Sequence, residues 1–583
     1  MKLVPRSITR DVDGTRSTSP LFGGPADGEA SHLLVAVESL SSEGFEWAVQ
    51  NVGDHPVTVR SVAIDFEVED VSASLRLFRH GYQSWSPTDV ATVGVDRDPS
   101  TQANLEFLQA AHHSDQRTVF DESIRSEWVT LLAEESRPDD EAILVGFLGG
   151  SQHDGTIWAV PTAPGATIVR VEAFLGGAIL DAGERRSLHP VRIDARSGVG
   201  PSDKLDDFAE EVGRRGAARV GGEYQVGWCS WYQYFHDVTE ADIRGNLAEA
   251  VTWPFEVFQI DDGYQAAIGD WLQTNEKFPS GLGALADSIS STSLTPGIWL
   301  APFLASPDSV LLADHPDFAA RHREGGPLRT WWNPPWGGGD EGFMYGLDTT
   351  NPAVLAHLEE TARSLREMGF RYLKLDFTFS PSVDGVYQDP SLTPAQRVRA
   401  GFEAIRRGAG DDCFLLACGV PLSNVVGVVD GVRIGQDVAP LWALDRSDEV
   451  IPGYLATQPA TQLAAESTMR RAFLHRRAWL NDPDCVMLRH VDTALSRQSA
   501  ASWAALIGFS GGMALVSDDL QLLDRDSREM LDKVIERGRA TDQWRRTGGV
   551  FEVDVLTSPW PTTINASGDR LVLDLETGRA SES

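Results

Sequence analysis

The chain falls into two stretches with different patterns of apolar and polar positions. Residues 1–200 lack long helical periodicity. They consist of short apolar runs broken by Gly, Pro, Asp and Asn, such as HLLVAVESL, VTVRSVAIDFEV and TIVRVEAF. Many short strands separated by turn-forming residues are typical of a β-sandwich. We therefore predict an N-terminal β-sandwich domain over residues 1–202, interrupted by the aromatic and polar loop LFRHGYQSWSP (77–87).

From about residue 203 the pattern alternates between apolar strands and helical segments. DKLDDFAEEVGRRGA predicts a linker helix, which we place at residues 203–220. Eight strand candidates follow, most with a helical segment after them: YQVGWCSW, FEVFQIDDG, TPGIWLAPF, RYLKLDF, CFLLACGVP, DGVRIGQDV, RAWLNDPDC and GMALVSDD. Continuously apolar strands separated by helices indicate a parallel sheet covered on both faces. Eight such units fit a (β/α)8 barrel.

We place this barrel at residues 221–541 and assign residues 542–583 to a short C-terminal β region, because they contain VFEVDV and RLVLDLE. The predicted fold class is therefore multi-domain, with an N-terminal β-sandwich, a central (β/α)8 TIM barrel and a short C-terminal β domain. A length of 583 residues agrees with this division, since domains average roughly 100–200 residues.

The composition restricts the partners and the compartment. Fifty Lys and Arg against 85 Asp and Glu give a net charge of −35. Such a surface repels phosphate backbones and anionic lipids, so we expect neither nucleic acid nor membrane as a partner. The N-terminus has no apolar core of a secretory signal, and the four Cys form no C-x-x-C pair. These features predict a cytoplasmic protein; its oligomeric state stays open, with a homo-oligomer among the options.

Polar and aromatic residues gather at the ends of the predicted barrel strands, where barrel enzymes hold their reactive groups. They are Asp261, Asp262, Trp299, Lys374, Asp376, Cys418, Gly419, Arg433, Asp437, Asn481, Asp482, Asp518 and Asp519. A rim rich in carboxylates suits glycoside chemistry, in which one carboxylate attacks and another moves the proton. A single Asp after a strand is more often a turn former or helix cap. The repetition at five of the eight strand ends favours a site.

Lys374 is informative because the chain contains only five Lys. It stands two residues before Asp376, and the alternation of a strand places both side chains on the same side. Its ammonium group is suited to donate to a sugar hydroxyl and to hold Asp376 ionised. Two other interpretations remain: a Schiff-base lysine, as in class I aldolases, and a Lys–Asp pair that only stabilises the barrel end.

FQIDDGY, YLKLDF and GWCSWYQYF, with GYQSWSP upstream, resemble the bacterial α-galactosidases (melibiases) of glycoside hydrolase family 36. Further matching segments are NEKFPSGLGALADSI, GIWLAPF, LDTTNPAV, LACGVPL, VRIGQDVAP and WLNDPDC. The resemblance covers roughly residues 77–87 and 222–520. It implies the same three-part fold and a retaining exo-α-glycosidase, most simply an α-galactosidase. Its substrate would be the terminal non-reducing α-D-galactosyl residues of oligosaccharides, and it would need no cofactor and no metal.

The resemblance also assigns roles. It implies that Asp376 is the nucleophile and that Asp437 is the general acid/base with a raised pKa. In a retaining enzyme the two carboxyl groups lie about 5–5.5 Å apart. Arg433 would help to hold the charge of the nucleophile. Asp261 and Asp262 match the pair that binds the 4- and 6-hydroxyls of galactose.

The remaining matches line the expected sugar pocket. Lys374 matches the donor to the other ring hydroxyls, and Cys418 and Gly419 match the small pair beside the 2-position. Trp299 and Trp228 match apolar walls. Trp85 matches a tryptophan that the N-terminal domain contributes.

Several alternatives stay open at this point. The same site would serve a transglycosylase or a glycosidase for another α-sugar, such as an α-N-acetylgalactosaminide or an α-glucoside, because GIWLAPF and CGVPL depart from the family pattern at the pocket walls. The small Cys418–Gly419 pair argues against an acetamido sugar. A class I aldolase-type lyase using Lys374 and a non-catalytic carbohydrate-binding protein are the alternatives from other functional classes.

Overall fold

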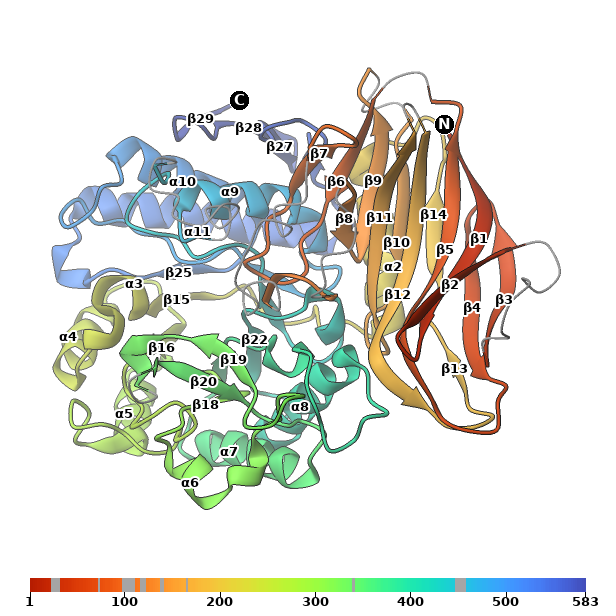
Figure 1. Cartoon of the computed structure of the whole chain (residues 1–583). Helices are drawn as coiled ribbons and strands as arrows, with labels where there is room; N and C mark the ends of the chain where they lie inside the picture. Colours follow the sequence, from red (N-terminus) through yellow and green to blue (C-terminus); the bar gives the residue numbers. More distant parts are fainter. Residues whose placement is uncertain are drawn as a thin grey trace.

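The computed structural model describes residues 1–21, 32–71, 74–96, 111–115, 122–136, 141–163, 166–337, 341–445 and 458–583. Within this part of the chain, two antiparallel N-terminal sheets stand beside a parallel barrel, and a small C-terminal sheet lies over the barrel's outer helices (Figure 1). The arrangement confirms the predicted fold class of β-sandwich, (β/α)8 barrel and short C-terminal β region.

The N-terminal strands form a sandwich. In the described residues the first sheet has the order β2(Thr15–Pro20), β1(Lys2–Val12), β5(Val57–Glu69), β12(Ala166–Leu180), β11(Asp154–Ala163) and β8(Ile124–Glu127). The second has the order β13(Arg185–Ser187), β4(Gly44–Asn51), β14(Val191–Asp194), β10(Ile143–Phe147), β9(Val129–Glu134), β6(Leu75–Arg79) and β7(Asp89–Thr92), with β3(Leu33–Ser41) beside β4. Phe45 of the second sheet stacks on Phe66 of the first at 5.9 Å between ring centroids, so apolar side chains of both sheets meet in one core.

A helix joins the sandwich to the barrel. Helix α2 spans Pro201–Gly216, whereas the sequence placed the linker at 203–220. Its buried residues Leu205, Phe208 and Val212 follow the spacing of one helical face. Phe208 packs edge-on against Trp128 of the sandwich, which stacks in turn on Trp479 beside the barrel. The helix is therefore part of the packed contact between the two domains.

The barrel is built from parallel strands that are buried at nearly every position. Their order is β24(Leu480–Asp482), β23(Gly431–Arg433), β22(Phe414–Ala417), β21(Tyr372–Leu375), β17(Thr295–Leu300), β16(Val257–Ile260), β15(Val226–Cys229) and β25(Ala514–Val516). The Met513 N–H donates to the Asn481 carbonyl at 2.9 Å, which brings the two end strands together. The barrel is thus nearly closed, and the carboxyl ends of all its strands point to the same end.

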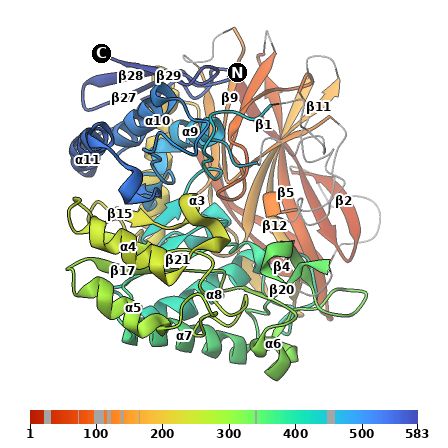
Figure 2. The ribbon, with the colours of Figure 1, turned by 90° about the vertical axis from the view of Figure 1, so that its left-hand side faces the viewer.

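Helices cover the outside of the barrel (Figure 2). They are α3(Trp231–Tyr234), α4(Glu240–Ala250), α5(Gly281–Ser290), α6(Val310–Asp314), α7(Pro352–Glu367), α8(Pro394–Ala409), α9(Thr461–Arg470), α10(Arg497–Ser510) and α11(Arg525–Arg546). Helix α8 illustrates why they form: Thr393 and Gln396 make a capping box at its start, and Gly410 with a φ of 78° ends it. Val398, Phe402 and Ile405 form its buried face.

A small antiparallel sheet is inserted after β17. It consists of β18(Leu304–Ala305), β20(Phe343–Gly346) and β19(Arg329–Trp332). Its strands and the turn that follows β19 carry Trp331, Trp332 and Trp336. This insertion places three tryptophans on the loops at the carboxyl end of the barrel.

The C-terminal sheet contains β26(Glu552–Val553), β27(Thr563–Ala566), β28(Asp569–Asp574) and β29(Arg579–Glu582). It lies beside α10 and is joined to the loop after β23, because the Trp442 indole donates to the Leu575 carbonyl at 2.8 Å. Helix α11 runs to Arg546, past the domain boundary expected at residue 541.

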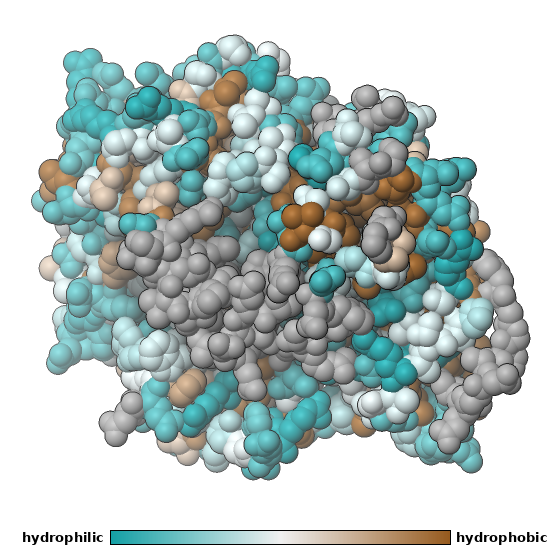
Figure 3. All heavy atoms as spheres, turned by 45° about the horizontal axis from the view of Figure 1, so that its top comes forward, coloured by the Kyte–Doolittle hydropathy of each residue, from teal (hydrophilic) through white to brown (hydrophobic). Residues whose placement is uncertain are grey.

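The described surface is largely polar. On the face drawn in Figure 3 the coloured atoms are mostly hydrophilic, and hydrophobic ones gather in limited patches, as expected for a chain with a net charge of −35. In the described residues no helix is both long and apolar enough to cross a membrane.

Candidate active site

Asp376 directly follows β21, with its backbone N–H still bonded to the Leu300 carbonyl of the neighbouring strand at 2.7 Å. The residue is 8% exposed. Both carboxylate oxygens accept N–H donors: the Trp299 indole at 3.0 Å on Oδ2 and the Phe377 backbone at 2.8 Å on Oδ1. Phe377 has a φ of 52°, in the left-handed region, which is an uncommon conformation for a bulky residue and is found most often at functional sites. Asp376 is therefore fixed in orientation.

Asp437 lies in the segment that follows β23 and accepts a hydrogen bond from Arg433 at 3.0 Å. Its side chain is more accessible than that of Asp376, at 34% exposed. Burial of the carboxyl group and the nearby charge of Asp376 raise the pKa of Asp437, against the opposing effects of Arg433 and Lys374. This raised pKa makes Asp437 the candidate proton donor of the pair.

Arg433 is buried among three carboxylates. Besides Asp437 it contacts Asp482 at 3.1 Å and Asp484 at 2.8 Å. Burial opposes the charged form, but Asp484 and Asp482 raise the pKa of Arg433 well above its usual value. Asp484, which sequence reasoning gave no role, also accepts from the Tyr232 hydroxyl. These partners fix the guanidinium that holds Asp437.

Lys374 forms its ion pair with Asp261. The distance from Nζ to Oδ2 is 2.8 Å, and the two residues are 5% and 1% exposed. Gln259 and Cys229 donate to the same oxygen, at 2.5 and 3.3 Å. Burial opposes protonation of the amine, but the carboxylate of Asp261 raises the pKa of Lys374 well above its usual value. An amine that stays protonated is a poor nucleophile, which disfavours a Schiff-base lysine.

The Asp262 carboxylate accepts hydrogen bonds from other donors than the Asp261 carboxylate does. Its Oδ1 accepts from Gln265 at 2.6 Å, while its Oδ2 accepts from the Trp336 indole at 2.7 Å and lies 3.1 Å from His236 Nδ1. Trp336 and His236 were not predicted as site residues. The only sequence signal for Trp336 was the WNPPW run at 332–336, and the only one for His236 was the YFHD segment at 234–237.

Trp85 reaches the carboxyl end of the barrel from the loop between β6 and β7. Its ring lies 5.0 Å from that of Phe377 and 6.2 Å from that of Trp331. A Cβ atom on Gly419 would lie 2.8 Å from Trp85 Cη2, so the ring sits directly against this glycine. Cys418, which precedes it, is 1% exposed, and burial followed by the charge of Asp376 raises its pKa.

Trp228 is placed differently from the other candidates. It is fully buried in β15, stacks on Phe258 at 4.4 Å and donates its indole N–H to the Asp518 carbonyl at 2.8 Å. These contacts are those of a core residue, and its part in a binding wall stays a prediction.

The structure therefore brings together most of the residues that were predicted from their position at the strand ends. Contacts join Trp299 to Asp376, Lys374 to Asp261 and Arg433 to Asp437. An oriented, buried carboxylate beside a carboxyl group of raised pKa is suited to pair a nucleophile with a general acid.

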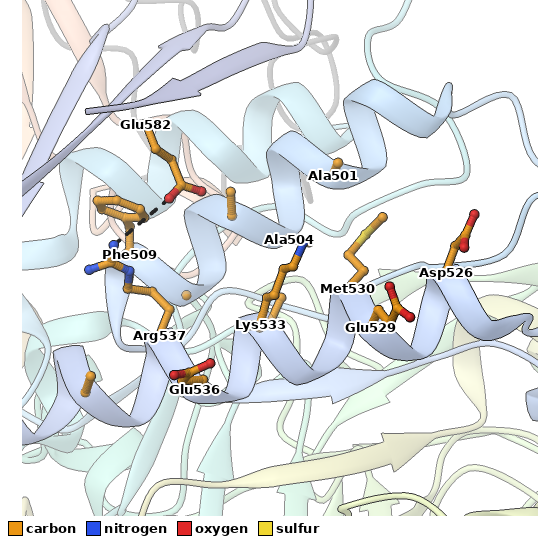
Figure 4. Close-up of a pocket in the computed structure, with 14 residues that line it drawn as sticks. Ala501, Ala504, Phe509, Asp526, Glu529, Met530, Lys533, Glu536, Arg537 and Glu582 are labelled. Carbon is orange, nitrogen blue, oxygen red and sulfur yellow. Dashed lines mark ion pairs between the residues drawn. The ribbon is translucent and has the colours of Figure 1, made fainter.

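A separate groove lies on the outer face of the barrel. Its volume is about 700 Å³, and it is formed by α10, α11 and β29 (Figure 4). Ala504, Phe509 and Met530 line its apolar part, and Arg537 faces Glu582 at 4.0 Å at one end. None of the predicted site residues lines it.

Comparison with known proteins shows a partial similarity to one family. Residues 225–379 match the family model described as Melibiase. The "Alpha-galactosidase 1" of Pediococcus pentosaceus is 34% identical over 96 residues, which are 15% of this chain and 13% of that protein. The "A type blood alpha-D-galactosamine galactosaminidase" of Flavonifractor plautii is 29% identical over 161 residues, 27% of this chain and 15% of that protein. The matches thus span only about a seventh of the length of these relatives.

The solved structures show the fold over the whole chain. The α-galactosidase TtGalA of Thermus thermophilus, in complex with p-nitrophenyl α-D-galactopyranoside, superposes with a TM-score of 0.70. It is 24% identical, and the match covers 97% of this chain and 98% of that one.

Proposed function

We propose that this protein, which resembles the α-galactosidases of glycoside hydrolase family 36, is a retaining exo-α-galactosidase. Its substrates would be oligosaccharides that end in a non-reducing α-D-galactosyl residue. The proposal draws on the Melibiase match over residues 225–379, on the α-galactosidase relative and on the likeness in fold to TtGalA.

One observation carries the chemistry: Asp376 is oriented by two N–H donors, and beside it the pKa of Asp437 is raised by burial and by the charge of Asp376. A glycosidase of the retaining class needs one carboxylate that is ready to attack and one carboxylic acid that is ready to donate. The chain presents both at the carboxyl end of one barrel.

In the proposed first step an oxygen of Asp376 attacks the anomeric carbon, and a β-galactosyl ester forms as the bond to the aglycone oxygen breaks. Asp437 gives its proton to that leaving oxygen. In the second step the Asp437 carboxylate takes a proton from water, the water oxygen attacks the anomeric carbon, and Asp376 is released. Two inversions give net retention. We expect the two carboxyl groups to be separated by about 5–5.5 Å in the reacting complex.

The proposed sugar-binding residues surround this pair. Asp261 and Asp262 would accept hydrogen bonds from the 4- and 6-hydroxyls, and Lys374 would donate to the other ring hydroxyls. Arg433 would act through Asp437, since its contacts are with that residue and two further carboxylates. The indole of Trp299 supports Asp376 directly, which makes it more than an apolar wall.

The contact of Trp85 with Gly419 supports a preference for galactose over a 2-acetamido sugar, because it leaves little room where we place the 2-position. An α-linked acetamido sugar is the second candidate substrate, because one relative is named a galactosaminidase. Transglycosylation on the same site would differ only in the acceptor of the second step. The aldolase alternative is disfavoured by the raised pKa of Lys374.

We further propose a cytoplasmic location. The four cysteines are free and buried, as expected in a reducing compartment.

A panel of aryl α-glycosides tests the proposal. We expect hydrolysis of the α-galactoside at least about tenfold faster, in kcat/KM, than that of the α-glucoside, α-xyloside or α-N-acetylgalactosaminide, with no hydrolysis of the β-galactoside. NMR of the first-formed product should show α-galactose, since retention preserves the anomer. Preference for the acetamido sugar, or formation of β-galactose first, would overturn the assignment.

A further inference from the structure

Arg471 is a buried cation at the contact between the two domains. It caps the C-terminal end of α9 and is fully buried. No carboxylate pairs with it among the residues that the structure describes. Burial lowers its pKa to about 9, so the guanidinium keeps its proton at neutral pH. Burying a charge without a counter-ion costs free energy of folding. A protein tolerates such a charge where other polar groups accept its hydrogen bonds.

Backbone carbonyls take the place of the missing carboxylate. Four of them belong to the loop of the N-terminal domain that carries Trp85. Nη1 donates to Ser84 at 2.8 Å, and Nη2 donates to Gly81 at 3.3 Å, Gln83 at 3.3 Å and Ser86 at 3.1 Å. One guanidinium thus gathers carbonyls from both sides of Trp85 and fixes the bend of the loop.

The fifth carbonyl belongs to the catalytic segment of the barrel. Nη1 also donates to the Ile434 carbonyl at 2.7 Å. Ile434 follows Arg433 directly and stands three residues before Asp437. The same side chain therefore holds the Trp85 loop and the segment that presents the proposed general acid.

A second attachment shows that the loop is bound to the barrel at more than one point. The Leu422 N–H donates to the Tyr82 carbonyl at 3.0 Å, and Gln83 forms an antiparallel bridge with Pro421. This second attachment lies just after Gly419, where the Trp85 ring rests. The connection between β6 and β7 can be followed from the sandwich to the barrel in Figure 1.

We propose that Arg471 is a positioning residue that sets Trp85 against Gly419 and, through Ile434, keeps the Asp437 segment in register with it. The inference rests on the proposed function, because its readout is galactoside hydrolysis. A lysine cannot replace the arginine, since a single ammonium with three donors lacks the planar fork that spans both segments.

The chain offers a matched control in the adjacent residue. Arg470 is also fully buried and also donates to carbonyls, but those of Val555, Thr557 and Pro559 in the C-terminal region. It additionally pairs with Glu466 at 3.0 Å. Arg470→Lys removes a comparable set of bonds away from the Trp85 loop.

The experiment compares Arg471→Lys and Arg470→Lys in the full-length protein with an aryl α-galactoside. We expect Arg471→Lys to lower kcat/KM by about tenfold or more with a raised KM, and Arg470→Lys to stay within about twofold of the parent at equal folded concentration. Equal effects of the two changes would overturn the inference. An inactive parent protein would instead refute the proposed function.

A double-mutant cycle with Trp85→Ala separates positioning from general stability. If Arg471 acts through Trp85, Arg471→Lys costs less in the Trp85→Ala background than in the parent, and the remaining loss comes from the Asp437 segment that it holds through Ile434. Fully multiplicative losses would contradict the inference.

Arg471→Gln provides a second variant, because a neutral amide is less costly to bury than a displaced charge. If neither Arg471 variant folds by circular dichroism while Arg470→Lys does, Arg471 is a residue of stability and the inference is wrong.

Discussion

Two aspartates at neighbouring places in the barrel have been given different properties by their surroundings. Asp376 receives N–H donors on both oxygens and has little contact with solvent. Asp437 has one guanidinium contact, is partly exposed and has a raised pKa. At the scale of single residues, the proposed roles of nucleophile and acid are distinguished by hydrogen-bond donors and charge, not by residue type.

The role of Asp376 predicts the effect of its removal. Asp376→Ala should reduce aryl α-galactoside hydrolysis by at least about a thousandfold, because it removes the carboxylate that is proposed to form the ester. Steady-state assays with calorimetric Tm values measure both activity and fold. Asp430→Ala is the matched control: Asp430 binds Arg219 and Arg406 at the opposite end of the barrel, so its loss should lower the Tm and spare kcat/KM. Retention of more than about a thousandth of the activity in Asp376→Ala would move the nucleophile elsewhere.

The role of Asp437 predicts a dependence on the leaving group. Asp437→Ala should slow substrates with poor leaving groups far more than activated aryl galactosides, because only the former need the proton. Equal losses across a series of aryl galactosides would contradict the assignment.

The same carboxyl group should set the alkaline limb of the pH profile. The acid must be protonated to donate, so kcat/KM falls as the pH rises through the pKa of Asp437. The Asp437→Asn variant should lose this limb. A profile unchanged in shape would assign the limb to another group.

At the scale of elements, the barrel strands were predictable and the loops between them less so. Lys374, Asp376 and Arg433 could be predicted as site residues because the end of each apolar run in the sequence marks the end of a strand. Trp336 could not, because it lies 36 residues after the end of β17, in an insertion without a periodic pattern, and only the fold brings its indole to Asp262. The partner of Lys374 was also missed: strand alternation suggested Asp376, yet the ion pair forms with Asp261 on another strand. Contacts between strands depend on register, which one sequence does not contain.

The contact between Gly419 and the Trp85 loop gives a prediction at the scale of elements. Gly419 has a φ of 54°, and an added Cβ would lie 2.8 Å from the Trp85 ring. Gly419→Ala should therefore lower kcat/KM by about tenfold or more, by displacing the ring or the strand end. The double variant Gly419→Ala with Trp85→Ala should lose less than the product of the single losses, because the clash is gone. Multiplicative losses measured by steady-state kinetics would show that the contact is not the cause.

At the scale of the whole molecule, buried acids in the N-terminal domain link stability to pH. Glu127 is 4% exposed and accepts from the Ser114 and Thr156 hydroxyls at 2.9 Å. Burial raises the pKa of Glu127 to about 7, with Arg125 acting against the shift and Asp154 adding to it. Burial likewise raises the pKa of Asp154 to about 6.

The sign of the effect follows from these shifts. At low pH both acids are protonated in the folded and the unfolded state, so no folding stability is lost there through their ionisation. As the pH rises, the unfolded chain ionises first, and the stability contribution of Glu127 is lost between about pH 4.5 and 7. We expect Glu127→Gln to raise the Tm by a few degrees at pH 8 and to change it little at pH 4. A Tm difference that is the same at both pH values would contradict this linkage.

The contact between the Trp85 loop and the barrel has a consequence for how such chains are inherited. The ring that rests on Gly419 and the carbonyls that bind Arg471 are encoded in the first hundred codons, and their partners more than three hundred codons later. Recombination near residue 200 between diverged homologues would separate the two halves of this contact. The sandwich and the barrel are therefore expected to be transmitted as one unit, and chimaeras that exchange the N-terminal domain should need the matching Arg471 and Gly419 segments from the same parent.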